Sequence, residues 1–92
     1  MRVRVRYLGS LSIAFGREEE YSVAEDKITL RELLLEILKN KNDFSRVIYS
    51  NGAPRPGYMI FVNETDYQIE GLDQVLKDGD TITIMPISHG GA

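Results

Sequence analysis

Hydrophobic and polar residues alternate sharply at the start of the chain. Residues 2–7 read Arg-Val-Arg-Val-Arg-Tyr, and a period of two with β-branched and aromatic residues predicts a half-buried strand over residues 2–8. Gly9-Ser10 then predicts a turn, after which residues 11–15 retain some strand character. Residues 18–23, where Tyr21 and Val23 repeat at period two behind three solvated glutamates, predict the returning strand.

The clearest predicted element is a helix that begins after Thr29. Thr29 and Glu32 have the spacing of a capping box, in which each residue satisfies a backbone N–H of the other. Asn40 and Asn42 end the helical pattern. Five apolar residues repeat at helical spacing and predict a stripe that packs in the core: Leu30, Leu33, Leu34, Ile37 and Leu38.

Residues 41–57 are predicted to be a connection rather than a regular element. Asn51-Gly52 is a turn pair, and Pro54 and Pro56 exclude a continuing helix. Because so long a structureless connection is uncommon in a small domain, we expect a short helical turn whose apolar residues are held against the core. These residues are Phe44, Val47 and Ile48.

Two more strands are predicted at 58–63 and 81–87, with a short helical turn around 72–76 between them. One helix can bury its stripe only against one face of one sheet. Parallel pairing of the first and last strands at the centre, with hairpins outside, then gives an α+β β-grasp, the ubiquitin-like fold. We therefore expect one domain over residues 1–87, with a mixed sheet of four to five strands on one main helix, followed by a tail at 88–92.

Composition sharpens this prediction mainly by exclusion. The chain has 92 residues, a net charge of −3 and no cysteine, which excludes disulfides, thiolate metal sites and a cysteine nucleophile. Its single histidine, His89, excludes the usual zinc site. Nucleic-acid binding normally needs excess Lys and Arg, so no direct nucleic-acid partner is expected. With no membrane-length apolar run and no signal peptide after Met1, the expected location is the cytoplasm, with no membrane partner.

The second half of the chain holds a set of distinctive motifs: Arg55-Pro56-Gly57, Val62-Asn63, Glu64-Thr65-Asp66-Tyr67, Gly71-Leu72-Asp73, Asp78-Gly79-Asp80 and Ser88-His89-Gly90-Gly91. Together these motifs resemble those of the ubiquitin-related modifier family, which unites sulfur carriers and protein modifiers. The match covers about the last 40 residues well, and the first half only by its strand–helix pattern. The Asp-Gly-Asp stretch is shared with the small subunit of molybdopterin synthase and the thiamine-pathway sulfur carrier.

This resemblance implies a carrier protein rather than an enzyme, with no cofactor or metal of its own. An adenylating enzyme of the ubiquitin-activating type would use ATP to convert the terminal glycine carboxylate into an acyl-adenylate. A sulfurtransferase would then give a thiocarboxylate, which donates sulfur to a tRNA base or supports attachment to target-protein lysines. The carried-over residues are Gly90 and Gly91, with Gly91 as the reacting end. Glycine suits this role because it has no Cβ and can thread a narrow channel.

Ala92 departs from this pattern because it follows Gly91 and holds the Gly91 carboxyl in a peptide bond. Three interpretations stay open: a peptidase removes Ala92, the chain is a precursor, or the extra residue blocks the chemistry. His89, beside the glycines, is predicted to serve recognition rather than catalysis.

Strand alternation also predicts a docking face on the outer side of the sheet. If the valines of the first strand face the helix, the arginines of that strand face outward. By the same alternation, Met59 and Phe61 of the third strand and Met85 of the last strand face outward. The β-grasp strand order is expected to place the arginines beside the last strand's methionine. Clustered Met and aromatic side chains mark partner sites, so we expect this face to bind the adenylating enzyme; the alternative is that the connection 41–57 buries the apolar members. The predicted docking face comprises Arg4, Arg6, Met59, Phe61 and Met85.

Two other functions stay open at this point. The chain could be the small subunit of molybdopterin synthase, whose tail inserts into a large catalytic subunit. It could also be a ubiquitin-like interaction domain whose tail never reacts, and Ala92 favours this second alternative.

Overall fold

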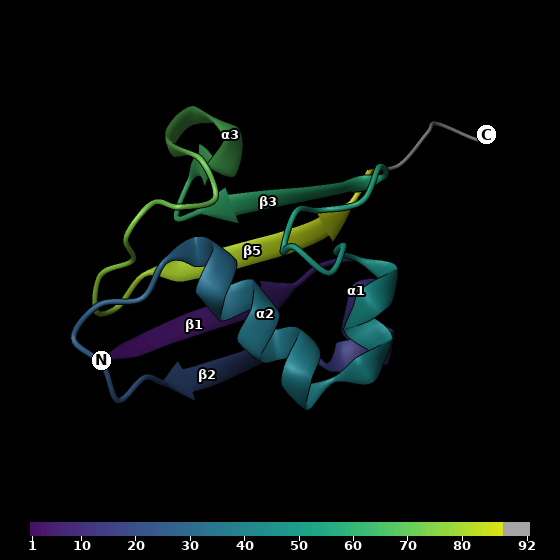
Figure 1. The fold of residues 1–92 in the computed structure, drawn as a ribbon. Coiled ribbons are helices and arrows are strands. Elements are labelled where there is room, and N and C mark those ends of the chain that lie inside the picture. Colours follow the sequence, from purple (N-terminus) through teal and green to yellow (C-terminus); the bar gives the residue numbers. More distant parts are fainter. Residues whose placement is uncertain (88–92) are drawn as a thin grey trace.

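Helix α2 (Leu30–Asn40) lies across one face of a five-stranded sheet (Figure 1). The structure is a computed structural model that describes residues 1–87. The other elements are β1 (Arg2–Tyr7), α1 (Leu11–Phe15), β2 (Glu18–Ser22), the 3-10 helix η1 (Asn42–Arg46), β3 (Tyr58–Val62), β4 (Thr65–Asp66), α3 (Tyr67–Glu70) and β5 (Thr81–Pro86).

The strand order in the sheet is β2-β1-β5-β3-β4. Strands β1 and β5 run parallel at the centre, while β1 with β2 and β3 with both β5 and β4 are antiparallel. This arrangement confirms the predicted β-grasp and the central parallel pair. The short strand β4, at one edge, was not predicted because two residues are too few to show a period.

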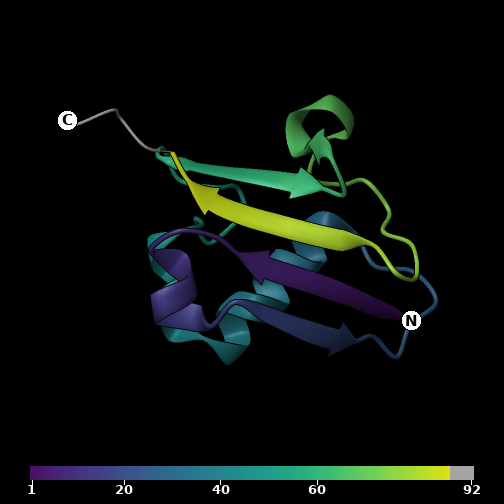
Figure 2. The same ribbon diagram turned by 180° about the vertical axis from the view of Figure 1, so that it is seen from behind.

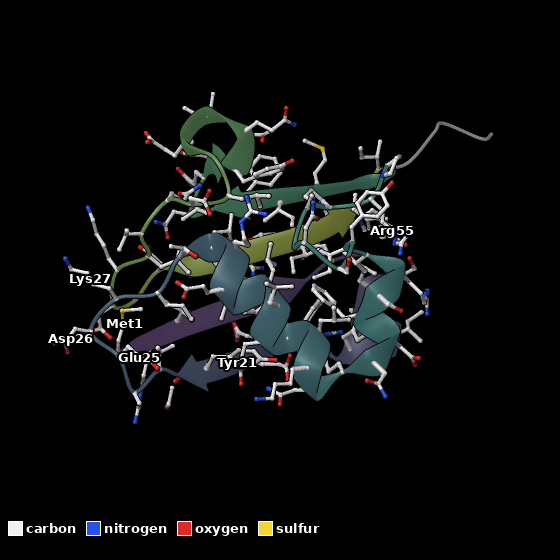
Figure 3. All side chains as sticks on the ribbon, in the orientation of Figure 1. Met1, Tyr21, Glu25, Asp26, Lys27 and Arg55 are labelled. Atoms are coloured by element: carbon white, nitrogen blue, oxygen red, sulfur yellow. The ribbon has the colours of Figure 1, made fainter. Side chains whose placement is uncertain are left out.

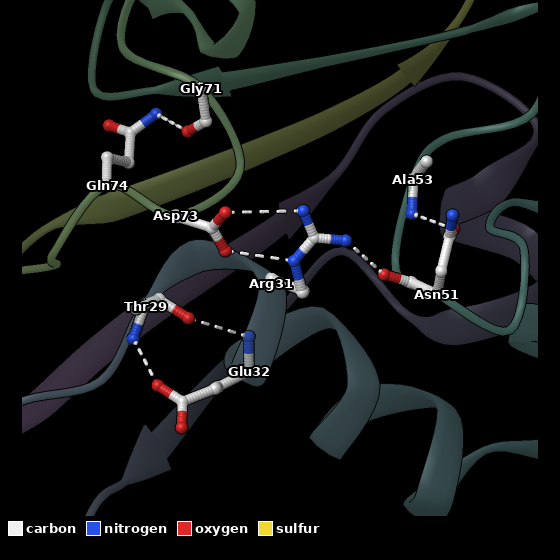
Figure 4. Close-up of polar contacts among 8 residues, drawn as sticks. All are labelled: Thr29, Arg31, Glu32, Asn51, Ala53, Gly71, Asp73 and Gln74. Carbon is white, nitrogen blue, oxygen red and sulfur yellow. Dashed lines mark hydrogen bonds and ion pairs between the residues drawn. The ribbon is translucent and has the colours of Figure 1, made fainter.

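The core lies between α2 and the inner face of the sheet. Val3, Val5 and Tyr7 of β1 are buried and alternate with exposed arginines, as predicted. The α2 stripe is buried except for Leu38, which is only partly buried. The capping box is present, with the Glu32 N–H donating to Thr29 Oγ1 at 3.1 Å and the Thr29 N–H to Glu32 Oε1 at 2.9 Å (Figure 4).

Two sequence expectations about secondary structure are wrong. Residues 11–15 form the helix α1 rather than strand, because one helical turn brings both Leu11 and Phe15 to the core. Phe15 packs there with Tyr7 and Phe44, at ring-centroid distances of 5.4 and 5.7 Å.

The second wrong expectation is the position of the late helical turn. It is α3 at Tyr67–Glu70, started by Asp66 accepting from the Gln68 N–H at 2.9 Å, and not the segment 72–76. Residues 72–76 instead lie along the start of α2, where Leu72 O accepts from the Arg31 N–H at 2.8 Å. The first N–H groups of a helix have no acceptor within that helix. Residues 72–76 supply carbonyl acceptors to the start of α2, and these carbonyls would not be available if the segment were itself a helical turn.

The connection 41–57 is held against the core as predicted. Phe44, Val47 and Ile48 are all buried, and Phe44 belongs to the 3-10 helix η1.

Arg31 joins this connection to the segment after α3 (Figure 4). Its Nε donates to Asp73 Oδ1 at 2.9 Å, and its second nitrogen Nη1 donates to the Asn51 carbonyl at 2.6 Å. Gly52 lies against the aliphatic part of Arg31 with φ +91°, a left-handed conformation that favours glycine. A Cβ at Gly52 would lie 2.9 Å from Arg31 Cγ.

Gly52→Ala is expected to destabilise the protein more than Gly71→Ala. Both positions have φ near +90°, so each substitution costs about 1–3 kcal/mol in backbone strain. Only Gly52→Ala also forces the tethered Arg31 to move, which adds about 1–3 kcal/mol of overpacking, because an added Cβ at Gly71 meets nothing within 4 Å. Urea unfolding of both variants measures the difference, and equal losses would contradict this role of Gly52.

The Arg31–Asp73 pair predicts sensitivity to acid. Hydrogen bonding from Arg31, and then its charge, lowers the pKa of Asp73 below its ordinary value. A lowered pKa in the folded state gives stability that is present above about pH 4 and is lost as pH falls through the folded pKa. Asp73→Asn should therefore flatten the loss of stability below about pH 4 in unfolding curves. Asp26→Asn, at an exposed carboxylate with no ion pair within residues 1–87, is the control and should leave the slope closer to wild type.

Candidate functional site

The predicted reactive tail leaves the body of the protein from the end of β5. Residues Ser88 to Ala92, which include His89, Gly90 and Gly91, lie outside the described residues. Ile87 is the last residue that the structure describes before the tail. The Ile87 N–H donates to the Gly57 carbonyl at 2.7 Å, which extends the β3–β5 ladder past Pro86.

This hydrogen bond brings together two motifs that are far apart in the sequence. Gly57 ends the Arg-Pro-Gly motif and has φ +98°, which turns the chain into β3. The motif therefore lies beside the root of the tail. Gly9, with φ +56°, approaches the same root from the end of β1, because an added Cβ there would lie 3.2 Å from Pro86 Cγ.

Arg55 organises the loop beside the tail root, a role that sequence reasoning missed. Its Nε donates to the carbonyls of Ser45 at 2.7 Å and Ile48 at 3.3 Å. Its guanidinium lies over the Tyr49 ring, 4.5 Å from the centroid, a cation–π contact. Figure 3 shows Arg55 at the end of the sheet where β5 finishes. The sequence marked the Arg-Pro-Gly motif as distinctive but held no signal of what it touches.

The outer face of the sheet carries the predicted docking face, and Figure 2 shows this face from behind, with no helix across the central strands. Met59 lies directly opposite Met85, and Phe61 lies opposite Thr83 on one side and Asp66 on the other. All three apolar residues are partly buried. The buried residues of the connection 41–57 pack in the core with α2, so they lie on the opposite side of the sheet.

The strand register corrects one part of the predicted docking face. Arg4 lies opposite Thr81 and Arg6 opposite Thr83, so neither arginine lies directly beside Met85. A band of threonines separates the arginines from the methionines. The reason is the offset of the parallel β1–β5 ladder, which alternation alone cannot determine.

The two arginines also differ in their surroundings. Arg4 forms an ion pair with Glu18 at 3.3 Å, and Arg2 pairs with Glu20 at 3.7 Å. For Arg6, no ion pair is present within residues 1–87. Arg6 is therefore the member of the docking face whose charge is available to a partner.

Within residues 1–87, no group of three or more His, Cys, Asp or Glu side chains is placed to hold a metal ion. No helix in this part of the chain has the length and apolarity to cross a membrane.

Comparison with known proteins decides the family. The family model described as Urm1 (Ubiquitin related modifier) matches residues 2–91. The ubiquitin-related modifier 1 of Saccharomyces cerevisiae is 33% identical over 99 residues, covering 99% of each chain.

The chain belongs to the ubiquitin related modifier family. Solved structures agree with this assignment. The small archaeal modifier protein 1 of Methanosarcina acetivorans is 27% identical with a TM-score of 0.78, over 98% of this chain and 96% of that one. A putative molybdopterin converting factor subunit 1 from Pyrococcus furiosus is 28% identical with a TM-score of 0.74, over 96% and 99%.

Membership in this family confirms the recognition made from the second-half motifs. The protein is a ubiquitin-like modifier and sulfur carrier, a small carrier protein and not itself an enzyme. The family match continues through Gly90 and Gly91 and stops before Ala92.

Proposed function

We propose that this modifier works through the Gly91 carboxylate, activated by a ubiquitin-activating-type adenylating enzyme. The observation that carries the proposal is that the family match runs from β1 through Gly91, while β5 leads directly to that tail and is held at Ile87 by Gly57. A rigid root with a glycine pair beyond it suits delivery of a carboxylate into an enzyme channel.

The proposed chemistry takes place in three steps. The carboxylate attacks the α-phosphate of ATP, and pyrophosphate leaves to give an acyl-adenylate. The outer sulfur of a sulfurtransferase persulfide then attacks the acyl carbon, and AMP leaves with one of the carboxylate oxygens. A thiol finally attacks the sulfurtransferase sulfur of the resulting acyl disulfide, which releases the thiocarboxylate and leaves a disulfide. The resulting thiocarboxylate is electrophilic at carbon and nucleophilic at sulfur, which allows either sulfur delivery, as in tRNA thiolation, or attachment to a target-protein lysine.

Ala92 must be removed before this chemistry can begin. An amide carbonyl carries no free oxygen anion to attack ATP, so the Gly91–Ala92 peptide bond masks the reactive group. We propose that a peptidase cleaves this bond. The family model matches the chain up to Gly91, so Ala92 lies outside the part that this model covers.

A mass assay tests both the removal of Ala92 and the activation of the Gly91 carboxylate. The chain with Ala92 and a form ending at Gly91 are incubated with cell extract, ATP and a sulfur source, and intact mass is measured. The form ending at Gly91 should gain about 16 Da, because one oxygen becomes sulfur, and conjugates should appear at higher mass. The chain with Ala92 should first lose that residue.

A form ending at Gly90 is the control and should gain sulfur far more slowly. If no form changes mass, the non-reactive interaction domain is favoured instead. Sulfur transfer that occurs only with a large molybdopterin synthase subunit would favour the second candidate, which the likeness to the Pyrococcus furiosus protein supports.

We also propose that the docking face binds the adenylating enzyme. Met59, Met85 and Phe61 form a partly buried apolar band on the same sheet as the tail root. Arg6 adds a charge available to acidic residues of the enzyme. His89, in the tail, is proposed to contribute to recognition in the enzyme channel.

Phe61→Thr should weaken activation while leaving the fold intact. Threonine suits a strand and avoids placing a carboxylate opposite Asp66, as Phe61→Asp would do. Losing a buried Phe contact costs about 1.5–3 kcal/mol, so ATP-dependent adenylation should fall about tenfold or more. Val75→Thr, at a residue that is 54% exposed and outside the docking face, is the matched control. Unchanged adenylation, or unfolding of Phe61→Thr, would count against the docking face.

A further inference from the structure

Strand β2 is an open edge of the sheet with unused hydrogen-bonding groups. In an antiparallel ladder, alternate residues direct both backbone groups toward the partner strand. The Val23 N–H donates to Met1 O at 2.7 Å and the Tyr7 N–H to Arg17 O at 2.9 Å, so the odd-numbered residues of 17–23 face β1. The even-numbered residues direct their N–H and C=O groups away from the sheet, where nothing within residues 1–87 bonds them. These residues are Glu18, Glu20 and Ser22.

A groove of about 320 Å³ runs beside this edge, between β2 and α2. Figure 3 shows Tyr21 at the sheet edge below α2, with Glu25 and Asp26 on the adjoining loop. The groove is therefore placed to receive side chains from any strand that pairs with β2. Its apolar lining is formed by Tyr21, Val23, Ala24, Ile28 and Leu33.

The strand side of the groove is held in place by a polar network on its inner surface. Tyr7 Oη donates to Glu19 Oε2 at 2.7 Å, Tyr21 Oη to the same oxygen at 3.3 Å, and Lys41 Nζ lies 3.0 Å from Glu19 Oε1. Burial, and then Glu19, raises the pKa of Tyr21 to about 12, so this hydroxyl stays a donor at physiological pH. A strand that is already ordered loses little entropy when a partner pairs with it.

Negative charge surrounds the groove. Glu25 and Glu36 line it and are exposed, and neither has an ion-pair partner within residues 1–87. Glu18 and Glu20 stand on the outer side of the same strand, where Glu18 is already paired with Arg4 and Glu20 with Arg2. The charge that is open to a partner is therefore mainly that of Glu25 and Glu36. A partner segment that alternates apolar and basic residues matches this pattern, because successive side chains of a strand point to opposite faces.

We propose that β2 accepts an extended segment of a partner protein as a sixth strand of the sheet. Its main chain would pair with Glu18, Glu20 and Ser22, its apolar side chains would enter the groove against α2, and its Lys or Arg side chains would lie beside the exposed glutamates. This is strand addition, in which main-chain bonds give affinity and alternate side chains give specificity.

The proposed edge is separate from the site of the tail chemistry. Strand β1 lies between β2 and β5, and the tail departs from β5. A segment on β2 would therefore leave the tail and the methionine–phenylalanine part of the docking face free, so that the modifier can hold one partner while its tail is in an enzyme.

A peptide of the sequence Lys-Val-Lys-Ile-Lys-Val, capped at both ends, tests the proposal by NMR titration of the full chain. The amide signals of Glu18, Glu20 and Ser22 should shift most, together with those of Ile28 and Leu33. Glu20→Pro removes one outward N–H without breaking the β1–β2 ladder, as edge strands tolerate. The Glu20→Pro variant should bind the peptide about tenfold more weakly, because it loses one main-chain hydrogen bond to the peptide and the local strand geometry that supports it.

Glu20→Gln is the matched control, since it removes the same charge and keeps the N–H; it should bind within about threefold of wild type. Ser22→Pro serves as a second blocking variant if Glu20→Pro does not fold. Glu36→Lys should weaken binding, whereas Glu70→Lys makes the same charge change on α3, away from the groove, and should not.

Three results would overturn the proposal. One is that the peptide Lys-Lys-Lys-Val-Ile-Val, which has the same composition without the alternation, binds as tightly as the alternating peptide. That result would show that charge attraction alone explains the binding. Another is that a folded proline variant binds as well as Glu20→Gln. The third is that the largest amide shifts fall on β3 and β5 rather than on β2.

Discussion

Strands β1 and β5 pair in parallel at the centre of the sheet, with Arg4 opposite Thr81 and Tyr7 opposite Ile84. Parallel strands cannot be joined by a tight turn, so the chain between them must cross over one face. Helix α2 lies in that crossover, and burying its apolar stripe covers the face. The same pairing fixes where the chain leaves the sheet, and hence where the tail begins.

Two loops complete the body because charged side chains cross-link them to regular elements. Arg31 on α2 holds both Asp73 and the Asn51 carbonyl, and the adjoining segment gives the first turn of α2 its missing acceptors. Arg55 binds two carbonyls of the connection from a motif that ends at Gly57, beside the tail. These contacts connect the stability of the fold to the position from which the tail departs.

The arrangement separates three tasks on one small domain. The inner face of the sheet provides the core, and the outer face carries a methionine–phenylalanine band with Arg6 across a threonine band. The β2 edge, with the groove against α2, is a third surface. A carrier needs such separation because its reactive end enters an enzyme while its body is recognised elsewhere.

The sequence by itself determined the elements whose cause is local. The alternation at residues 2–7, the capping box of Thr29 with Glu32 and the stripe on α2 each follow from neighbours within a few residues, and all three are present. The second-half motifs were likewise enough to identify the family, because they are read in one dimension. The Gly90-Gly91 pair was visible for the same reason.

Only the tertiary structure decided the features that depend on distant partners. Residues 11–15 became helical because that shape brings Leu11 and Phe15 to the core together. Residues 72–76 stayed non-helical because α2 needed acceptors for its first N–H groups. The β1–β5 register placed Arg6 beside Thr83 instead of Met85, and the fold brought Gly57 to Ile87. A repeating pattern shows which face a side chain occupies, but the offset between strands is set by hydrogen bonds and packing across the whole domain.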